Sequence, residues 1–332
     1  MEASFLWSAS SCFTFFLLSS SVSYQTLATD FIFLGFSNLA ELQKLLFVVF
    51  LLLYLVTLST NATIITIIRL DPSLHTPMYF FLSILSFLET CYTFVIVPKM
   101  LVDLLAERKA ISFLGCAVQM YFFLFLGCFH SFLLATMGYD RFVAICHPLH
   151  YNSIMTRRVC VQLVVASALI GLLVAQADTT LVFCLPFQAS RKLNHFFCDI
   201  APVLSVAFAH TNLSEAVVFT LAIFVLLIPL MLILISYLFI LFAILKIPSA
   251  TGRRKAFSTC SAHLMVVVVH YGCACSIYLR PNASYSSDQD AVSSVAYTIL
   301  TPLLNPMIYS LRNKDVKTAL RKTAGKFRST DR

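Results

Sequence analysis

An acid and a base stand side by side where a long apolar run of the sequence ends. Asp140 and Arg141 follow more than twenty almost uncharged residues. Such an ion pair is stable while neighbouring helices cover it, and it can open when they separate. The pair could therefore act as a latch, and the alternative is that both side chains only solvate a helix end. Pro148 lacks a backbone donor and ends this helix.

Two other groups of side chains could do chemistry. His270, Cys273 and Cys275 are residue types that bind zinc. Their offsets of three and five residues turn Cys275 well away from the other two on a helix, so we predict no metal site. Glu89 is the one acid that we place well inside an apolar run, where a carboxylate needs a proton, a cation or a polar partner. No nucleophile stands with a base at membrane depth, so an enzyme is not predicted.

The elements that must position these residues are membrane spans. The chain is 59% hydrophobic and only 11% charged, whereas a soluble domain has about a quarter charged residues. A helix needs about 20 mostly apolar residues to cross a bilayer, and runs of this length lack the alternation of barrel strands. We predict an all-α membrane protein, a bundle of seven transmembrane helices. The spans are expected at about 45–68, 77–97, 113–137, 159–185, 216–245, 257–279 and 291–311.

The charges indicate how the bundle is oriented. On the side of the C-terminus we count 16 of the 23 Lys and Arg residues, which predicts a cytoplasmic C-terminus and an extracellular N-terminus. The net charge of +8 is therefore a topology signal and does not indicate nucleic-acid binding. In the tail, Val316, Leu320 and Ala324 form a stripe among basic residues, which predicts a short amphipathic helix on the inner lipid leaflet. For the first residues, a cleaved signal peptide and an extracellular extension both stay open.

Five ordered sequence blocks resemble one receptor family. MGYDRFVAICHPLHY is similar to the MAYDRYVAICHPLHY signature of the olfactory receptors, a branch of the rhodopsin-like G-protein-coupled receptors. LHTPMYFFLS, PKML, RRKAFSTCSAHL and PLLNPMIYSLRNKDVK also resemble that family. The resemblance implies an extracellular segment 1–44, a seven-helix receptor domain 45–311 and a cytoplasmic tail 312–332. It also implies a plasma-membrane receptor for small volatile odorants that activates a stimulatory, olfactory-type G protein and raises cAMP.

The resemblance assigns roles to the switch residues. Asp140 and Arg141 become the latch, and Arg141 is expected to face the G protein once the sixth span swings outward. Tyr237 and Tyr309 are expected to reach Arg141 after the pair opens, or else to be ordinary interfacial tyrosines. Pro306 frees a backbone carbonyl that Asn305 can bond, so the seventh span is expected to bend there. Glu89 lies where related receptors have a sodium-linked acid, with Asn61 and Asn305 as expected partners; the alternative is a protonated acid without an ion.

The family match also concerns the cysteines and the sequons. It implies a disulfide between Cys116 and Cys198 that tethers the long loop between the fourth and fifth spans, residues 186–215, over the bundle mouth. A second loop bridge of the family has neither of its cysteines here, so we expect a looser loop and a free thiol at Cys184. The expected N-terminal sequon is absent, which leaves Asn212 and Asn282 as glycosylation candidates.

A ligand pocket is expected between the outer halves of spans three, five, six and seven. Its lining is apolar and the third span has no acid, so we expect a small neutral hydrophobe rather than a charged amine. At each position the alternative is helix packing alone. A transporter or channel would need polar residues continuing through the bundle, and the sequence does not supply them. The expected lining residues are Phe123, Leu124, Gly127, Cys128, Leu221, Ala222, Val225, Tyr271, Ala274, Cys275, Tyr278, Val295 and Thr298.

Overall fold

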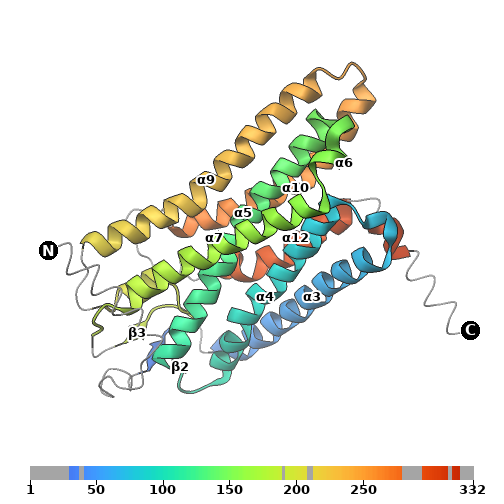
Figure 1. Ribbon diagram of the computed structural model, residues 1–332. Coiled ribbons are helices and arrows are strands. Elements are labelled where there is room, and N and C mark those ends of the chain that lie inside the picture. The colour runs from blue at the N-terminus through green and yellow to red at the C-terminus, as the bar shows by residue number, and fades with distance from the viewer. Residues whose placement is uncertain are drawn as a thin grey trace, which may run out of the picture.

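Long helices run side by side through most of the molecule (Figure 1). The computed structural model describes residues 30–36, 41–188, 191–207, 212–278, 294–312 and 316–321. Each predicted span coincides with a helical segment in these ranges. The prediction of a helical membrane bundle is confirmed, and the differences concern where the helices begin and end.

The first two spans form a helical hairpin. Helix α3 (Gln43–Leu70) is joined by a short turn, η2 (Pro72–Leu74), to helix α4 (Pro77–Leu105), which has proline in its first turn. The second span was expected to end at residue 97, but α4 continues for two more turns. The continuation carries Lys99 and Asp103, which pair one turn apart on the same helix. A hydropathy pattern ends the predicted span at the first charged residue. The helix itself continues beyond the hydrocarbon layer, because the charged side chains there pair with each other.

Helix α5 (Phe113–Cys146) is the central element of the bundle. The hydroxyl of Ser112 caps it by accepting from the backbone N–H of Gly115. Two short turns, η3 (Pro148–His150) and α6 (Tyr151–Ile154), follow at its inner end. Because α5 continues past the apolar run, it brings the charged pair inside the bundle rather than beside it.

The remaining helices complete the wall around α5. Pro229 lies inside the fifth span and Pro306 inside the last. A stretch of wider π-helical turns leads into the final helix, and such widening is frequent at functional positions. The elements are α7 (Arg157–Phe183), α8 (Ile200–Leu204), α9 (Asn212–Leu245), α10 (Ala250–Tyr278), η4 (Ala296–Leu300) and α12 (Thr301–Arg312).

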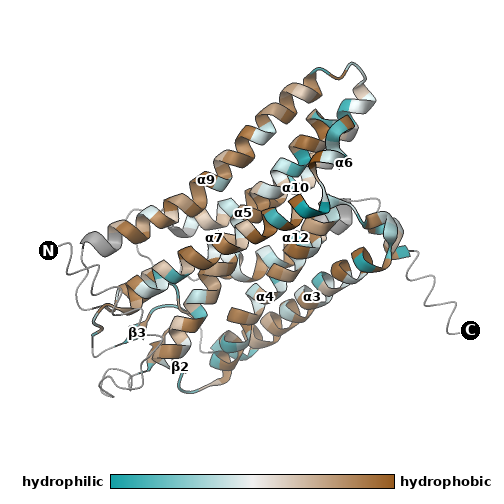
Figure 2. Ribbon diagram, in the orientation of Figure 1, coloured by the Kyte–Doolittle hydropathy of each residue, from teal (hydrophilic) through white to brown (hydrophobic). Residues whose placement is uncertain are grey.

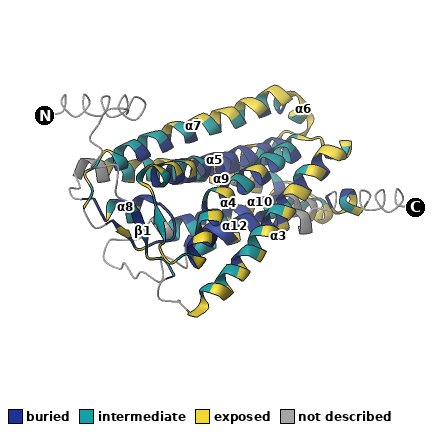
Figure 3. Ribbon diagram, turned by 90° about the horizontal axis from the view of Figure 1, so that it is seen from below, coloured by how far each residue is buried: buried dark blue, intermediate teal, exposed yellow. Residues whose placement is uncertain are grey.

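The outer surface of the helices is apolar. Brown, hydrophobic residues cover α3, α7 and α9 on their outward faces (Figure 2). Helices α3 and α7 carry exposed residues in Figure 3, and α9 has many exposed apolar side chains. Of the most apolar windows, 67% of residues are buried in α5 but only 17% in α9. Exposed apolar surface of this extent is compatible with lipid as the solvent. Among the described residues five helices are long and apolar enough to span a membrane, and α10 has a shorter apolar stretch, Cys260–Ser276.

A small sheet lies at the end of the bundle opposite α6 (Figure 1). Strand β1 (Phe31–Phe33) runs antiparallel to β2 (Ala110–Ile111) and parallel to β3 (Lys192–Leu193). Phe31 and Phe33 are buried. The sequence pattern did not predict this sheet, because strands of two or three residues give no detectable alternation.

Arg191 fixes the sheet to the neighbouring loop. Its guanidinium lies 5.5 Å from the ring centre of Phe31 and 5.6 Å from the rings of Phe113 and Phe187. A cation over aromatic faces is stabilised by their quadrupoles. The long loop is thereby packed onto the N-terminal strand and the start of α5.

The tail contains a helical segment at 316–321. Val316 and Ala319 are buried and pack against the main core, whereas Lys317 and Arg321 are exposed. The apolar stripe of this segment therefore rests on the bundle itself. Ala324, the last residue of the predicted stripe, lies outside the described residues.

Candidate functional site

The charged pair at the inner end of α5 is closed and buried. The Nε of Arg141 donates to Oδ2 of Asp140 over 3.0 Å, and its Nη2 contacts the same oxygen. The hydroxyl of Tyr151 donates to Oδ1 of Asp140 over 2.8 Å. Asp140 is 1% exposed and Arg141 is 7% exposed. Neither side chain solvates a helix end, so the geometry fits a closed latch.

Helix α10 is held against α5 and α9 next to this latch. His263 of α10 donates through Nε2 to the backbone oxygen of Leu134 in α5 over 3.0 Å. Its Nδ1 lies 2.9 Å from the hydroxyl of Tyr237 in α9. Tyr237 was expected to reach Arg141 in an open bundle, and here its hydroxyl is held at α10. His263 therefore ties three helices together in the closed arrangement.

Glu89 of α4 is buried among polar side chains of neighbouring helices. The amide of Asn305 in α12 donates to its Oε1, and Nδ1 of His130 in α5 lies 3.6 Å from the same oxygen. A hard cation such as sodium prefers oxygen ligands, whereas both of these partners are nitrogen groups. The sodium ion stays a prediction, and the observed contacts favour the alternative in which side chains satisfy the acid.

A chain of histidines leads from Glu89 toward the outer half of the bundle. The ring centres of His130 and His270 lie 4.2 Å apart. Nε2 of His270 is 3.0 Å from the hydroxyl of Ser131, and its ring is 5.8 Å from that of Tyr297. Ring contacts thus join the buried acid to the aromatic residues above it. His270 takes part in these contacts with His130 and Tyr297.

Asn61 corrects the expected hydrogen bonding at the proline of α12. Pro306 has no N–H for the carbonyl of Pro302, four residues before it. The amide of Asn61 in α3 donates to that carbonyl oxygen over 3.2 Å. Asn305, which was expected to bond the freed backbone, bonds Glu89 instead. Asn61 is thus a partner of α12 rather than of Glu89.

An aromatic layer contains the first group of expected ligand residues. The ring of Phe123 lies 4.8 Å from Phe197 of the long loop and 5.5 Å from Tyr92 of α4, measured between ring centres. A side-chain carbon at Gly127 would lie 3.5 Å from the hydroxyl of Tyr297. Phe123 and Gly127 therefore both lie beside Tyr297, and Tyr92 and Tyr297 are neighbours that the sequence pattern missed.

The second group of expected ligand residues lies where α5 packs against α9. Cys128 packs in a cluster to which Leu221 and Val225 of α9 also belong. Thr298 is fully buried and its hydroxyl donates to the backbone oxygen of Ser294, so it is already satisfied. Of the others, Leu124, Ala222, Cys275 and Val295 are half-buried, Tyr271 and Ala274 are buried, and the Tyr278 side chain is outside the described residues.

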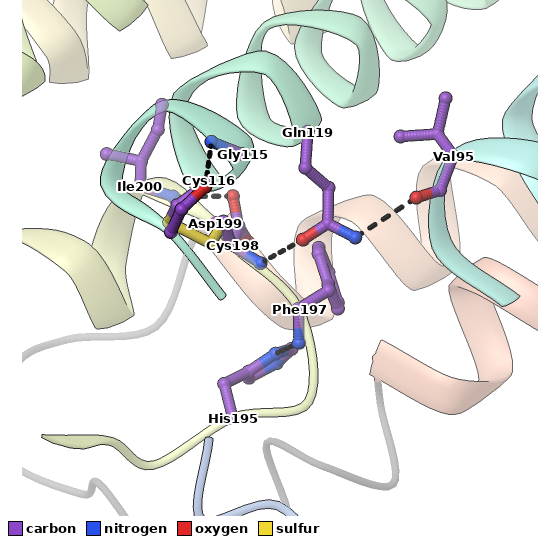
Figure 4. The surroundings of a disulfide bond; sticks show 10 residues. Val95, Gly115, Cys116, Gln119, His195, Phe197, Cys198, Asp199 and Ile200 are labelled. Carbon is purple, nitrogen blue, oxygen red and sulfur yellow. Dashed lines mark hydrogen bonds between the residues drawn. A yellow bond between two sulfur atoms is a disulfide. The ribbon is translucent and has the colours of Figure 1, made fainter. Parts of the chain in front are cut away.

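The disulfide between Cys116 and Cys198 is present, as expected, with the two Cα atoms 5.5 Å apart (Figure 4). Gln119, almost one turn along α5, supports the same loop. Its Oε1 accepts from the backbone N–H of Cys198 over 3.0 Å, and its Nε2 donates to the backbone oxygen of Val95 over 3.0 Å. One glutamine thus connects α4, α5 and the loop directly beneath the disulfide.

The loop is held at two further points. Nε2 of His195 lies 2.9 Å from the hydroxyl of Ser294, just before the last helix. Burial lowers the pKa of His195 to about 4, so it is neutral at pH 7. Gln188 bonds the backbone at Val206 over 3.0 Å and at Ala207 over 3.4 Å. These bonds hold the segment at the place where the family's second bridge is absent.

Comparison with known proteins identifies the family. The family model described as olfactory receptor matches residues 50–326. The chain belongs to the olfactory receptor family. Human olfactory receptor 10K2 is 64% identical over 296 residues, which are 89% of this chain and 95% of that protein. Human olfactory receptor 10K1 is 62% identical over 301 residues, 91% of this chain and 96% of that protein. Human olfactory receptor 10R2 is 58% identical over 301 residues, which are 91% of this chain and 90% of that protein.

Membership settles the general class. This olfactory receptor is a rhodopsin-like G-protein-coupled receptor and a multi-pass membrane protein, and it is not an enzyme. Among its described residues, no group of three or more His, Cys, Asp or Glu side chains could hold a metal ion.

Two predictions for this receptor need correction, one about a cysteine and one about a buried acid. Cys184 was expected to be a free thiol, but it is disulfide-bonded. Glu89 was taken as the one acid well inside a span, but Asp178 is also buried, at 4% exposed, in the interior of α7. Asp178 falls within the predicted fourth span, 159–185, but it stands near the end of that apolar run and was therefore not taken as an acid well inside a span.

Some expected sites of the receptor fall outside the described residues. These are Asn282 and the side chains of Asn212 and Tyr309. Sequence reasoning also missed four buried polar residues that connect the described helices. They are Gln119, His130, His195 and His263. Their only signal was that each is a polar residue in or beside an apolar run.

Proposed function

We propose that this receptor binds a small, mostly apolar volatile molecule in the outer half of its bundle and activates a stimulatory, olfactory-type heterotrimeric G protein. Agonist binding then raises cAMP. The observation that carries the proposal is the buried pair of Asp140 and Arg141, closed under α10 at the inner end. Agonist affinity need only be higher for the open arrangement than for the closed one to shift the equilibrium.

The inner end supports a switch rather than a fixed structure. Arg141 is kept from solvent by neighbouring helices, and His263 fastens α10 next to it. Releasing α10 would expose a guanidinium with five donors to a partner. We infer that Arg141 then contacts the G protein, with Tyr237, Asn305, Pro306 and the nearby Tyr309 supporting the open form.

The outer half supports the choice of ligand. The aromatic layer of Phe123, Tyr92 and Tyr297 meets Phe197 of the loop, so a ligand there touches α4, α5, η4 and the loop together. Apolar ring faces favour a small hydrophobic molecule. Through His270 the same layer is connected to Glu89 and α12. A ligand that shifts these rings can therefore bias the helices around the buried acid.

We further propose that the receptor lies in the plasma membrane with its N-terminus outside. A disulfide indicates an oxidising compartment at the end where Cys116 and Cys198 lie. The excess of Lys and Arg on the C-terminal side supports a cytoplasmic position for the opposite end. Residues 1–44 are then the extracellular segment, 45–311 the receptor domain and 312–332 the cytoplasmic tail, with lipid against the apolar outer faces.

A cell assay tests the coupling. Cells that express the stimulatory olfactory G protein are exposed to a panel of volatiles, and cAMP is measured for the wild type, for Arg141→Ala and for Arg158→Ala. Arg158 is an exposed arginine at the start of α7, at the same inner end of the bundle, and serves as the matched control. We expect Arg158→Ala to respond normally and Arg141→Ala to lose the response at equal surface expression. An unchanged response of Arg141→Ala, or an ion current or solute flux without G-protein coupling, would contradict the proposal.

A further inference from the structure

Asp178 differs from the other buried acids of this receptor. Among the described residues the buried acids are Glu89, Asp103, Asp140, Asp178 and Asp199. The other four each have a partner, respectively Asn305, Lys99, Arg141 and the backbone N–H of Ile200. Asp178 makes no ion pair, and its buried Oδ1 has no hydrogen-bond partner within the part of the chain that the structure describes. A carboxyl oxygen buried without a partner costs folding free energy, so its presence calls for a role.

The position of Asp178 on α7 indicates which helices it faces. Val174 lies one turn further in, on the same face of α7. Val174 packs with Cys128 of α5, and Leu221 and Val225 of α9 pack against the same cluster. Helix α7 contacts both α5 and α9 in the bundle (Figure 1). Asp178 therefore lies beside three of the residues expected to line the ligand site.

The next turn outward is also apolar. Val182 packs beneath the loop disulfide with Cys116 and Met120. Asp178 is thus bracketed along its helix face by two apolar clusters, and neither supplies a donor. The hydroxyl of the adjacent Thr179 is buried and also lacks a hydrogen-bond partner in the described chain. Two unsatisfied polar groups occur together at the level of the outer half of the bundle.

We propose that Asp178 is the polar anchor of the ligand site and accepts a hydrogen bond from a donor group on an otherwise apolar odorant. The donor is a hydroxyl or a protonated amine, and the hydrocarbon part of the same molecule packs against Cys128, Leu221 and Val225. The inference rests on the proposed odorant-binding function and refines it. It also reopens amines as ligands, since the acid that the third helix lacks is supplied by α7.

The test compares odorants that share one carbon skeleton and differ in the donor. For each skeleton, an alcohol and a primary amine are set against the methyl ether and the alkane. Binding to purified receptor is measured as the ligand-induced rise in melting temperature across a concentration series, and cAMP is measured separately in cells. The variants are Asp178→Leu, Asp178→Asn and, as a matched control, Asp103→Leu. Asp103 is a buried helical aspartate with a partner and lies at another place in the bundle.

The wild type should bind at least one donor-bearing odorant about tenfold more tightly than its donor-free match, and Asp178→Leu should abolish that ratio. Asp178→Asn keeps an accepting oxygen, so it should retain the preference for the alcohol and lose the preference for the amine. If donor-bearing and donor-free odorants bind the wild type equally, or the ratio survives in Asp178→Leu, the proposal is wrong. Donor-dependent binding without any cAMP response would instead refute the proposed coupling and leave the anchor intact.

The stability of the unliganded receptor gives a second readout. Asp178→Leu should raise its melting temperature because an unsatisfied buried group is removed, whereas Asp103→Leu should lower it because Lys99 loses its partner. A melting temperature that falls in Asp178→Leu would mean that the carboxyl group serves the fold, and the anchor would be refuted.

Discussion

Replacing His263 with phenylalanine should make the receptor active without an agonist. The imidazole makes two hydrogen bonds, a buried one to the backbone oxygen of Leu134 over 3.0 Å and a partly buried one to the hydroxyl of Tyr237 over 2.9 Å. Each such bond contributes about 0.5–1.5 kcal/mol, so their loss weakens the closed state by about 1–3 kcal/mol. Phenylalanine keeps most of the volume, which limits the effect of a cavity.

The expected gain follows from the two-state equilibrium. Since about 1.4 kcal/mol is a factor of ten, a receptor that is about 1% open would become about 10% open. Over the whole range of about 1–3 kcal/mol the open fraction would reach between about 5% and about 60%, so basal cAMP should rise at least about fivefold at matched surface expression. Leu264→Ala, on the outward face of the same helix, is the control and should leave basal cAMP unchanged. A basal signal equal to wild type in His263→Phe would refute the view that this histidine holds the closed state.

Three further predictions concern the loop and the last helix. Cys198→Ser should lower the melting temperature and surface expression, because a native disulfide contributes about 2–5 kcal/mol; normal expression would contradict the tether. Asn61→Leu should lower the melting temperature by leaving the carbonyl of Pro302 unbonded, whereas an unchanged value would show that water satisfies it. The bond between His195 and Ser294 should loosen on acidification. The pKa of His195 is lowered to about 4 in the folded state, so stability is full above about pH 6.5 and falls as the pH drops toward 4. Hydrogen exchange of the loop should increase over that window, and His195→Gln should remove the pH dependence.

The sequence predicted the helices because each span is a long uncharged run. It also identified the switch residues Asp140 and Arg141, because they stand where a long apolar run ends. It placed the last residues of α4 wrongly, because hydropathy reports the hydrocarbon layer and not the helix, whereas Pro148 correctly indicated where α5 ends. Lys99 and Asp103 satisfy each other and allow α4 to continue beyond the predicted span.

Long-range partners could not be predicted from a single chain. Asn61 and Pro302 are 241 residues apart, and only the packing of α3 on α12 brings them together. His130 and His270 likewise meet through the packing of α5 and α10. The family resemblance identified Asn305 correctly as a partner of Glu89, but residue types alone did not tell which carbonyl each asparagine reaches.

Asp178 shows a second limit of sequence reasoning, which is that the burial of a visible residue cannot be predicted from its position alone. It is visible in the sequence as an acid near the end of the predicted fourth span, and this position gave no sign that its side chain is buried. Only the burial of its side chain against the α5 and α9 seam revealed that it lies within the bundle. The ligand residues predicted by helical periodicity divide in the structure between this seam and the aromatic layer around Phe123.

The central claim is that an odorant in the outer half opens the inner end between α5 and α10. The most direct test is a pulsed electron-spin distance measurement in purified receptor with labels at Leu149 and Arg254, which are both exposed near that end. Labels should be attached to genetically encoded amino acids, because the chain has 11 cysteines. The account predicts that an activating odorant adds a population with a longer distance, and that His263→Phe shows part of it without odorant. An activating odorant that raises cAMP and leaves this distance unchanged would contradict the account.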